Sequence, residues 1–288
     1  MNLNIAGAVT HFDELIVNIL KVRSKNKDIN FTVYDGPNLC RWNGGRVNRD
    51  IVLEPRMIEM YNKLGIKVAL TFTNPIIELD DKVGNELLEL LNFYGKKYNI
   101  RNKIILVNDE LRKYIRNRYD FTLVYSVTGH PSDVEITEGL INRYLELETK
   151  YDMIVPKFEV VFEEKWYSRV DRSKYELLTN DTCSYACPYF REHFEAIANL
   201  NRVSNKPWEE VGFKQCFDTE ECFIPEFDPD KGSPEQIEEY GPKLGMDYND
   251  EMYSRALDLG FTSFKLAGRE NTSDHLLDDI RKFLRDIR

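Results

Sequence analysis

The sequence predicts a (β/α)8 barrel of the TIM type, built as one domain over residues 1–288. Short apolar runs rich in β-branched residues recur eight times along the chain, as expected of strands buried on both faces of a parallel sheet. Amphipathic helical patterns fill most intervals between them. No G-x-G-x-x-G or G-x-x-x-x-G-K-[ST] motif follows any of the runs, which argues against a nucleotide-binding open sheet.

Each expected strand is about four to eight residues long. The strands are Leu3–Val9, Phe31–Tyr34, Lys67–Phe72, Lys103–Val107, Phe121–Ser126, Met153–Val160, Tyr175–Thr179 and Thr262–Leu266. The helices expected between and after them are Phe12–Leu20, Ile51–Leu64, Asn85–Tyr94, Leu111–Arg118, Ile136–Leu147, Pro188–Leu200 and a last one over Leu276–Ile287. Only the connection near Ser168–Ser173 is too short and polar for a prediction.

The interval between the seventh and eighth strands is longer than one helix requires. We predict that residues 201–258 form an acidic, cysteine-containing insertion over the carboxyl-terminal face of the barrel. Between Asp218 and Asp258 there are 13 acidic and 3 basic residues, which account for the whole net charge of −10. Such a charge run is usually a solvated surface segment, and a protein partner that binds at residues 218–258 is the alternative.

The composition is that of a folded, enzyme-sized protein, with 42% apolar residues in 288. No stretch approaches the ~20 apolar residues that cross a membrane, and the first residues lack the zones of a signal peptide. We therefore expect a cytoplasmic protein that does not contact a membrane.

Four cysteines lie within 40 residues: Cys183, Cys187, Cys216 and Cys222. Thiols that cluster in a reducing compartment usually bind a metal or act in redox chemistry. If the chain turns helical at Cys183, the first two lie one turn apart on one face. Four thiolates suit either tetrahedral zinc or an iron–sulfur cluster. The irregular gaps of 3, 28 and 5 residues favour a cluster whose ligands come from separate loops. The alternative is that these thiols are small buried hydrophobes.

Cys40, in a glycine-rich turn after the second strand, is the substitute if Cys216 or Cys222 is not a ligand. His193 follows Cys187 by six residues, so it is predicted to be a ligand or a proton shuttle. A histidine in this position more often bonds a neighbouring helix.

Polar residues also follow the expected strands, at the barrel end where TIM-type enzymes carry their chemistry. Asp35 follows the second strand, Asn180 and Asp181 follow the seventh, and Lys265 and Arg269 come from the eighth. Because both charge signs are present, we expect a pocket for a small molecule or a nucleic-acid base.

Several blocks resemble the collagenase-like peptidases of family U32, which include RNA- and ubiquinone-hydroxylation proteins. The block Leu257–Glu270, which contains Phe264-Lys-Leu-Ala-Gly-Arg, is similar to the family's segment ending in Lys-Ile-Glu-Gly-Arg. Weaker similarities cover Leu3–Asn18, Lys67–Pro75 and Ile104–Lys157. The resemblance implies a barrel and a four-iron–four-sulfur cluster (4Fe-4S). Its ligands would be Cys183, Cys187, Cys222 and either Cys216 or Cys40.

The sequence departs from the family at two points. Ala267 stands where the family has the glutamate of its Glu-Gly-Arg motif, although Glu270 follows Arg269. The family's glycine-rich run around its cysteines is replaced by Cys183-Ser-Tyr-Ala-Cys-Pro. No nucleophile–base pair is recognisable, so proteolysis is not expected.

The leading hypothesis is therefore an oxidoreductase with an iron–sulfur cluster that modifies, most plausibly hydroxylates, a nucleobase or small aromatic ring, as in RNA modification. A zinc enzyme of base exchange, similar to tRNA-guanine transglycosylases, is the first alternative. Their Asp-Ser-Gly-Gly-Phe motif is absent. A non-catalytic subunit of a larger assembly is the second.

Overall fold

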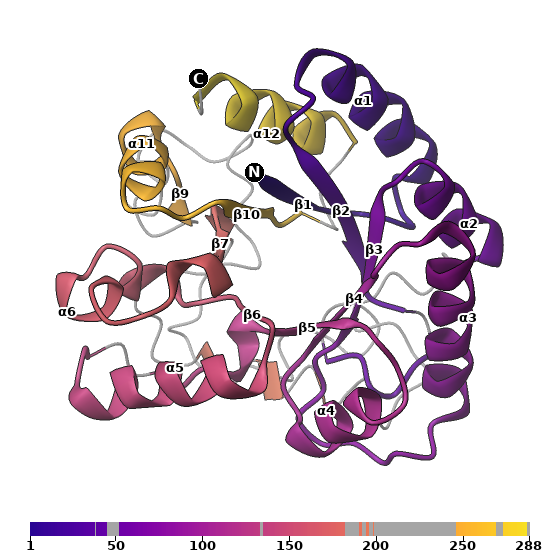
Figure 1. The fold of residues 1–288 in the computed structure, drawn as a ribbon, viewed down its shortest axis with the longest axis horizontal. Helices are drawn as coiled ribbons and strands as arrows, with labels where there is room; N and C mark the ends of the chain where they lie inside the picture. The colour runs from indigo at the N-terminus through magenta and orange to yellow at the C-terminus, as the bar shows by residue number, and fades with distance from the viewer. Residues whose placement is uncertain are drawn as a thin grey trace, which may run out of the picture.

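Eight strands form one parallel sheet in the order β6-β5-β4-β3-β2-β1-β10-β7 in the computed structural model of the chain. An isolated parallel bridge between Ile154 and Tyr175 joins its two edges. The sheet therefore closes into the predicted barrel, with helices around it (Figure 1). The structure describes residues 1–37, 39–44, 52–132, 135–181, 190–191, 194–195, 198, 246–268 and 273–286.

The eight barrel strands match the eight predicted runs. They are β1 (Asn2–Ala6), β2 (Asn30–Asp35), β3 (Lys67–Phe72), β4 (Lys103–Leu106), β5 (Thr122–Tyr125), β6 (Met153–Ile154), β7 (Glu176–Leu178) and β10 (Ser263–Leu266). A separate antiparallel pair joins β8 (Asn180–Asp181) to β9 (Met246–Asp247).

The described helices alternate with the barrel strands. They are α1 (Phe12–Lys25), α2 (Pro55–Lys63), α3 (Lys82–Tyr98), α4 (Asp109–Arg116), α5 (Glu138–Lys150), α6 (Glu164–Tyr167), α11 (Asp250–Asp258) and α12 (Ser273–Asp286). Three 3₁₀ turns accompany them: η1 (Val127–Gly129), η2 (Phe158–Val160) and η3 (Arg172–Lys174).

Side-chain caps fix where several helices begin. Asp81 caps α3, Asn108 caps α4, Thr137 caps α5 and Asn249 caps α11, each by accepting a backbone N–H of the first turn. Helix α2 begins at Pro55, because proline is already shaped for the first helical position.

Two elements differ from the prediction for physical reasons. Strand β6 ends at Ile154, not at Val160, because Pro156 has no N–H to donate to a neighbouring strand. Residues 250–258, which fall in the predicted insertion, form α11. This helix lies between α6 and α12 in the outer ring (Figure 1). It buries Tyr253 and Ala256 in the main hydrophobic core, between the strands and the helices.

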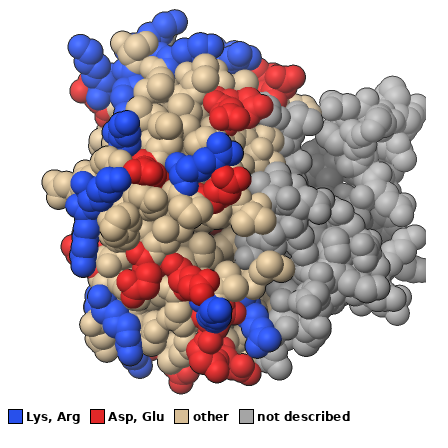
Figure 2. Space-filling view, turned by 90° about the vertical axis from the view of Figure 1, so that its right-hand side faces the viewer, with Lys and Arg blue, Asp and Glu red and all other residues tan. Residues whose placement is uncertain are grey.

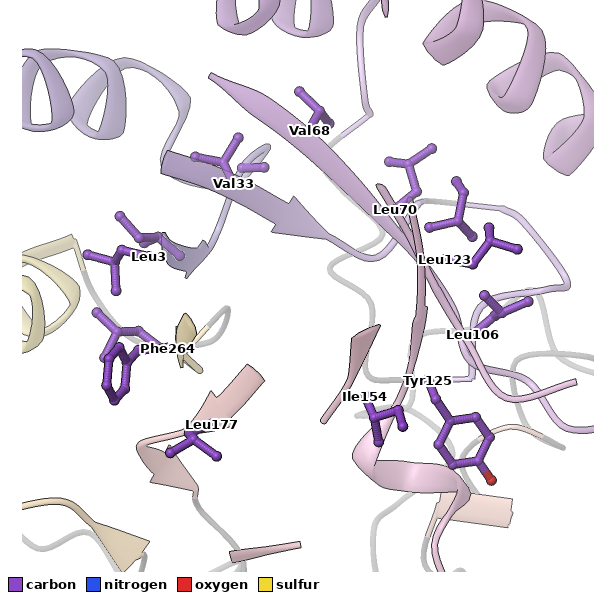
Figure 3. Close-up of a cluster of buried hydrophobic side chains, with 14 of the residues drawn as sticks. Leu3, Val33, Val68, Leu70, Leu106, Leu123, Tyr125, Ile154, Leu177 and Phe264 are labelled. Carbon is purple, nitrogen blue, oxygen red and sulfur yellow. The ribbon is translucent and has the colours of Figure 1, made fainter. Parts of the chain in front are cut away.

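The main hydrophobic core lies between the strands and the helices. Figure 3 shows Leu3, Val33, Leu106 and Phe264 on the helix-facing side of their strands. Helix α6 has only one turn and could not form alone. It is held by Trp166, which is fully buried against the rings of Tyr144, Tyr175 and Phe261.

On the face beside α2 and α3, Lys and Arg side chains are interspersed with Asp and Glu (Figure 2). The surface there carries both signs, as expected if the acidic excess belongs to residues 218–258. Within the described part of the chain, no helix combines the length and the apolar character needed to cross a bilayer.

Candidate functional site

Near the amino-terminal ends of the strands, the barrel interior is closed by a buried polar layer. Lys103 Nζ lies 3.2 Å from Glu176 Oε2 and 2.6 Å from Asn4 Oδ1. The Asn4 amide donates onward to the carbonyl oxygen of Phe264 at 3.0 Å. Because these residues come from β4, β7, β1 and β10, the bonds span the interior. In this floor layer, defined by Lys103, Glu176 and Asn4, the ammonium has both a carboxylate and an amide oxygen as partners.

Above the floor, a ring of side chains from successive strands fills the barrel. It comprises Ala6, Tyr34, Ala69, Ile105, Val124, Val155 and Leu178, with Val127, Met153 and Ala267 packed against it. Three of these residues are alanines, and Tyr34 is the bulkiest side chain among them. The ring separates the floor layer from the mouth, which is the carboxyl-terminal end of the barrel.

Lys265 and Tyr34 meet at this mouth. The Lys265 ammonium lies 4.2 Å from the centroid of the Tyr34 ring, within the range of a cation–π contact. The Tyr34 hydroxyl donates to the carbonyl oxygen of Leu266 at 2.8 Å, which fixes the ring. Lys265 is only 7% exposed. A buried ammonium at the end of a barrel strand is a suitable group to bind an anionic or carbonyl oxygen.

Asp35, predicted to position substrate, has a structural task. Its Oδ2 accepts the N–H of Val9 at 2.9 Å, and its Oδ1 accepts the N–H of Gly36 at 2.8 Å. The side chain thus holds the loop after β1 against the end of β2. A carboxylate that accepts two backbone N–H groups is well compensated, and it stabilises the loops at the mouth.

Asn180 joins two barrel strands and a helix. Its Oδ1 accepts the N–H of Ala267 at 2.6 Å, and its Nδ2 donates to Asp279 of α12 at 3.0 Å. Asn180 therefore braces the ends of β7 and β10. Asp181 pairs through its backbone with Met246 in the β8–β9 ladder.

Lys157 and Glu159 form a second polar group at the mouth, beyond β6. Lys157 Nζ lies 3.9 Å from Glu159 Oε1, donates to the carbonyl oxygen of Ser132 at 3.0 Å and lies 5.0 Å from the Phe190 ring centroid. Both charged side chains are at least 95% buried. A pair this deeply buried requires further hydrogen bonds to offset its desolvation, and the Ser132 carbonyl supplies one.

Cys40 has the surroundings of a core thiol. It is 4% exposed and belongs to the main hydrophobic core together with Trp42. Burial, followed by the nearby Asp81 carboxylate, raises the pKa of the thiol, which disfavours the thiolate that binds metals. Asp81 also fixes this loop to α3 by accepting the N–H of Arg41 and of Gly84.

The other predicted centre lies outside the described residues. This applies to Cys183, Cys187, Cys216, Cys222, His193 and Arg269, so their roles stay predictions. Among the described residues there is no group of three or more His, Cys, Asp or Glu side chains arranged to hold a metal ion.

Two features of the mouth were not among the predicted site residues. Tyr34 ends a predicted strand, and its inward orientation follows from the period of two that places it two residues beyond Thr32. Lys157 and Glu159 fall in a run predicted as strand. Pro156 ends that strand, and a proline in a strand pattern is the sequence signal that Lys157 and Glu159 lie in a loop.

The fold and the placement of these groups define a (β/α)8-barrel protein whose polar groups lie at both the floor and the mouth. Among solved structures, the chain is similar to the U32 peptidase Mk0906. The sequence identity is 13% and the TM-score is 0.53. The match covers 93% of this chain and 93% of that chain. The resemblance to family U32 is therefore confirmed as a distant likeness of fold. No protein-family model matches the sequence, and no curated protein does.

Proposed function

We propose that this protein is a barrel enzyme that carries out oxidative modification, specifically hydroxylation, of a nucleobase or small aromatic ring at the mouth. The observation that carries the proposal is the buried Lys265 ammonium stacked on Tyr34 at the end of a barrel strand. TIM-type barrels carry their chemistry at this end, and the floor layer closes the other. The U32-like fold supports an enzyme but names no substrate for this chain.

The chain's own groups at the mouth would bind and orient the substrate. Lys265 is suited to hold a carbonyl or anionic oxygen of a nucleobase, because its ammonium is only 7% exposed and an electrostatic contact is strong where water is excluded. The Tyr34 ring limits where that oxygen can lie. Lys157, with its compensating Glu159, is placed to orient a second polar group of the substrate.

We further propose that Cys183, Cys187, Cys216 and Cys222 hold a metal centre, a 4Fe-4S cluster in preference to zinc. Such a cluster, when bound, supplies one-electron transfer. Cys40 is the one cysteine among the candidate ligands whose surroundings the structure describes. Its burial in the hydrophobic core and its raised pKa do not fit a ligand, which favours Cys216 as the fourth thiolate.

Anaerobic purification followed by iron, sulfide and zinc analysis tests this assignment. We expect about four iron atoms and four sulfide ions per chain, and a brown colour from thiolate-to-iron charge transfer. Cys183→Ser should lose the iron and the colour. Cys40→Ala is the matched control and should keep both.

A colourless protein with stoichiometric zinc would overturn the iron–sulfur assignment and support the zinc alternative. If Cys40→Ala loses iron as completely as Cys183→Ser while remaining folded, the choice of ligands is wrong. A protein partner that binds at residues 218–258 remains a separate prediction, testable by co-purification with and without that segment.

A further inference from the structure

A cavity lies beside the barrel mouth, over the ends of β3, β4 and β5. Its volume is about 250 Å³, slightly below the range of about 300–1,000 Å³ typical of small-molecule sites. Pro75, Val107 and Phe194 give it an apolar wall, whereas Arg143 of α5 and Thr128 of η1 give it polar groups. A cavity of this size and lining suits a small ligand with an apolar body and one polar end.

Arg143 is fixed in this cavity by two hydrogen bonds. Its Nη2 donates to the carbonyl oxygen of Gly129 at 2.9 Å and to the Tyr125 hydroxyl at 3.2 Å. The Tyr125 hydroxyl in turn donates to the same Gly129 oxygen at 2.7 Å. Gly129 permits this close packing, because a Cβ there would lie 2.5 Å from the Tyr125 hydroxyl oxygen. The guanidinium is thus preorganised.

Among the described residues, Arg143 forms no ion pair. Glu146, one turn along α5, has its pKa lowered by Lys150 and, to a smaller extent, by the charge of Arg143, but it is exposed and paired with Lys150 at 2.6 Å. Its Nε is buried without a hydrogen-bond partner. Two carboxylates do line the cavity, but both have other partners. Asp109 is paired with Arg112 at 2.7 Å and Lys113 at 2.9 Å, and Glu195 is paired with Arg191 at 2.8 Å. The Arg143 side chain is only partly exposed, and a guanidinium that is shielded from water without an ion-pair partner is a candidate to bind an external anion.

We propose that this cavity, the Arg143 pocket, binds the carboxylate of a small monoanionic ligand whose apolar part contacts Val107 and Phe194. One uncompensated guanidinium balances one negative charge. A phosphate dianion would exceed that charge and would face the carboxylates of Asp109 and Glu195. The proposal does not depend on the metal centre or on the chemistry at Lys265.

Isothermal titration of the full chain with benzoate, benzamide and phenyl phosphate tests the proposal. Benzoate has the required carboxylate and ring, benzamide is its neutral isostere, and phenyl phosphate carries the dianion. We expect benzoate to bind at least about tenfold more tightly than either of the other two, as follows from the strength of a charge-assisted hydrogen bond. Arg143→Met should weaken benzoate binding by about tenfold or more.

Arg118→Met is the matched control, because it removes the same charge from an exposed position two residues beyond the end of α4. It should leave benzoate affinity unchanged. Circular dichroism and the melting temperature show whether Arg143→Met remains folded, and Arg143→Lys, which keeps the charge, should retain part of the affinity. Four results would each overturn the proposal. The first two are that benzamide binds as tightly as benzoate, or that phenyl phosphate binds more tightly. The others are that folded Arg143→Met keeps its affinity for benzoate, or that benzoate does not bind at all. Iron content is irrelevant to every arm, so failure here is distinguishable from failure of the proposed cluster.

Discussion

Lys103 and Arg143 are cations at opposite ends of the barrel, and they differ in burial and in partners: Lys103 is buried, whereas Arg143 is partly exposed. Lys103 lies in the floor layer, where Glu176 and Asn4 satisfy its charge and hydrogen bonds. Arg143 lies over the ends of β4 and β5, where it meets a hydroxyl and a carbonyl oxygen but no acid among the described residues. The floor is a completed polar network, whereas the Arg143 pocket is incomplete without an external anion.

This difference follows the usual division of a TIM-type barrel, in which the amino-terminal end serves stability and the carboxyl-terminal end serves function. The predicted site residues also differ in what their side chains contact. Asp35 and Asn180 lie at the mouth but satisfy backbone groups and brace strands. The ammonium of Lys265 lies over the Tyr34 ring, 4.2 Å from its centroid. Position at a strand end is thus insufficient evidence for a catalytic role, and the hydrogen-bond partners decide.

The largest expected effect is that of breaking the floor layer. Glu176→Gln keeps the shape of the side chain but leaves Lys103 buried without its counter-charge. Removing one partner of a buried ion pair typically costs about 3–5 kcal/mol. The free energy of unfolding, measured by urea denaturation, should fall by that amount.

The control for this experiment is Glu138→Gln. Glu138 pairs with Arg169 at the surface, where the two side chains are 75% and 39% exposed, so the loss should stay below about 1 kcal/mol. If the free energy of unfolding falls equally in the two variants, the floor layer does not stabilise the protein more than a surface ion pair does.

A smaller effect is expected from His130, which packs beneath the Arg143 pocket between Tyr125 and Tyr144. Burial, with a smaller contribution from the positive charges of Arg143 and Lys157, lowers the pKa of His130 to about 3. The folded protein therefore keeps this ring neutral where the unfolded chain, with a pKa of about 6.5, binds a proton. The stabilisation is complete above the unfolded pKa and is lost as the pH falls towards the folded pKa.

The expected loss of stability from His130 is about 2 kcal/mol between roughly pH 7 and pH 5. Urea denaturation at a series of pH values measures it. His130→Phe removes the titrating group and should flatten the curve over that interval, even though the variant loses the hydrogen bond to the Val155 oxygen. If the wild-type and variant curves remain parallel, His130 is not the group responsible.

Asn180→Ala should cost less, about 1–3 kcal/mol, because it leaves a partly buried backbone N–H of Ala267 without its acceptor. Thermal or urea unfolding measures the change. Asn18→Ala is a suitable control, since Asn18 makes only an exposed bond within α1. An Asn180→Ala variant with wild-type stability would show that the Asn180 side chain does not brace these strand ends.

The barrel itself was predictable from sequence because buried parallel strands leave a strong local signal of continuous apolar runs. Lys67–Phe72 was predicted to the residue. The sequence signal was weaker where one residue overrides a pattern, as Pro156 does after β6. It was also weaker where a helix such as α11 lies in a charge-rich segment.

The candidate site was less predictable, because its residues are defined by partners distant in sequence. Lys103 and Glu176 are 73 positions apart and no local pattern pairs them. Arg143 lies within an ordinary amphipathic helix, and only the fold brings it to Gly129 and Tyr125. Cys40 was grouped with the other cysteines by composition, whereas its burial beside Trp42 follows from the packing of its loop on α3.

The central claim is that the floor cation serves stability and the pocket cation serves a ligand. Urea unfolding of Lys103→Met and Arg143→Met, side by side and without added anions, tests it most directly. We predict a loss of about 3–5 kcal/mol for Lys103→Met, because Glu176 is left buried and unpaired. For Arg143→Met we predict a change within about 1.5 kcal/mol, because the bond between Tyr125 and Gly129 remains. Equal losses in both variants would contradict the claim.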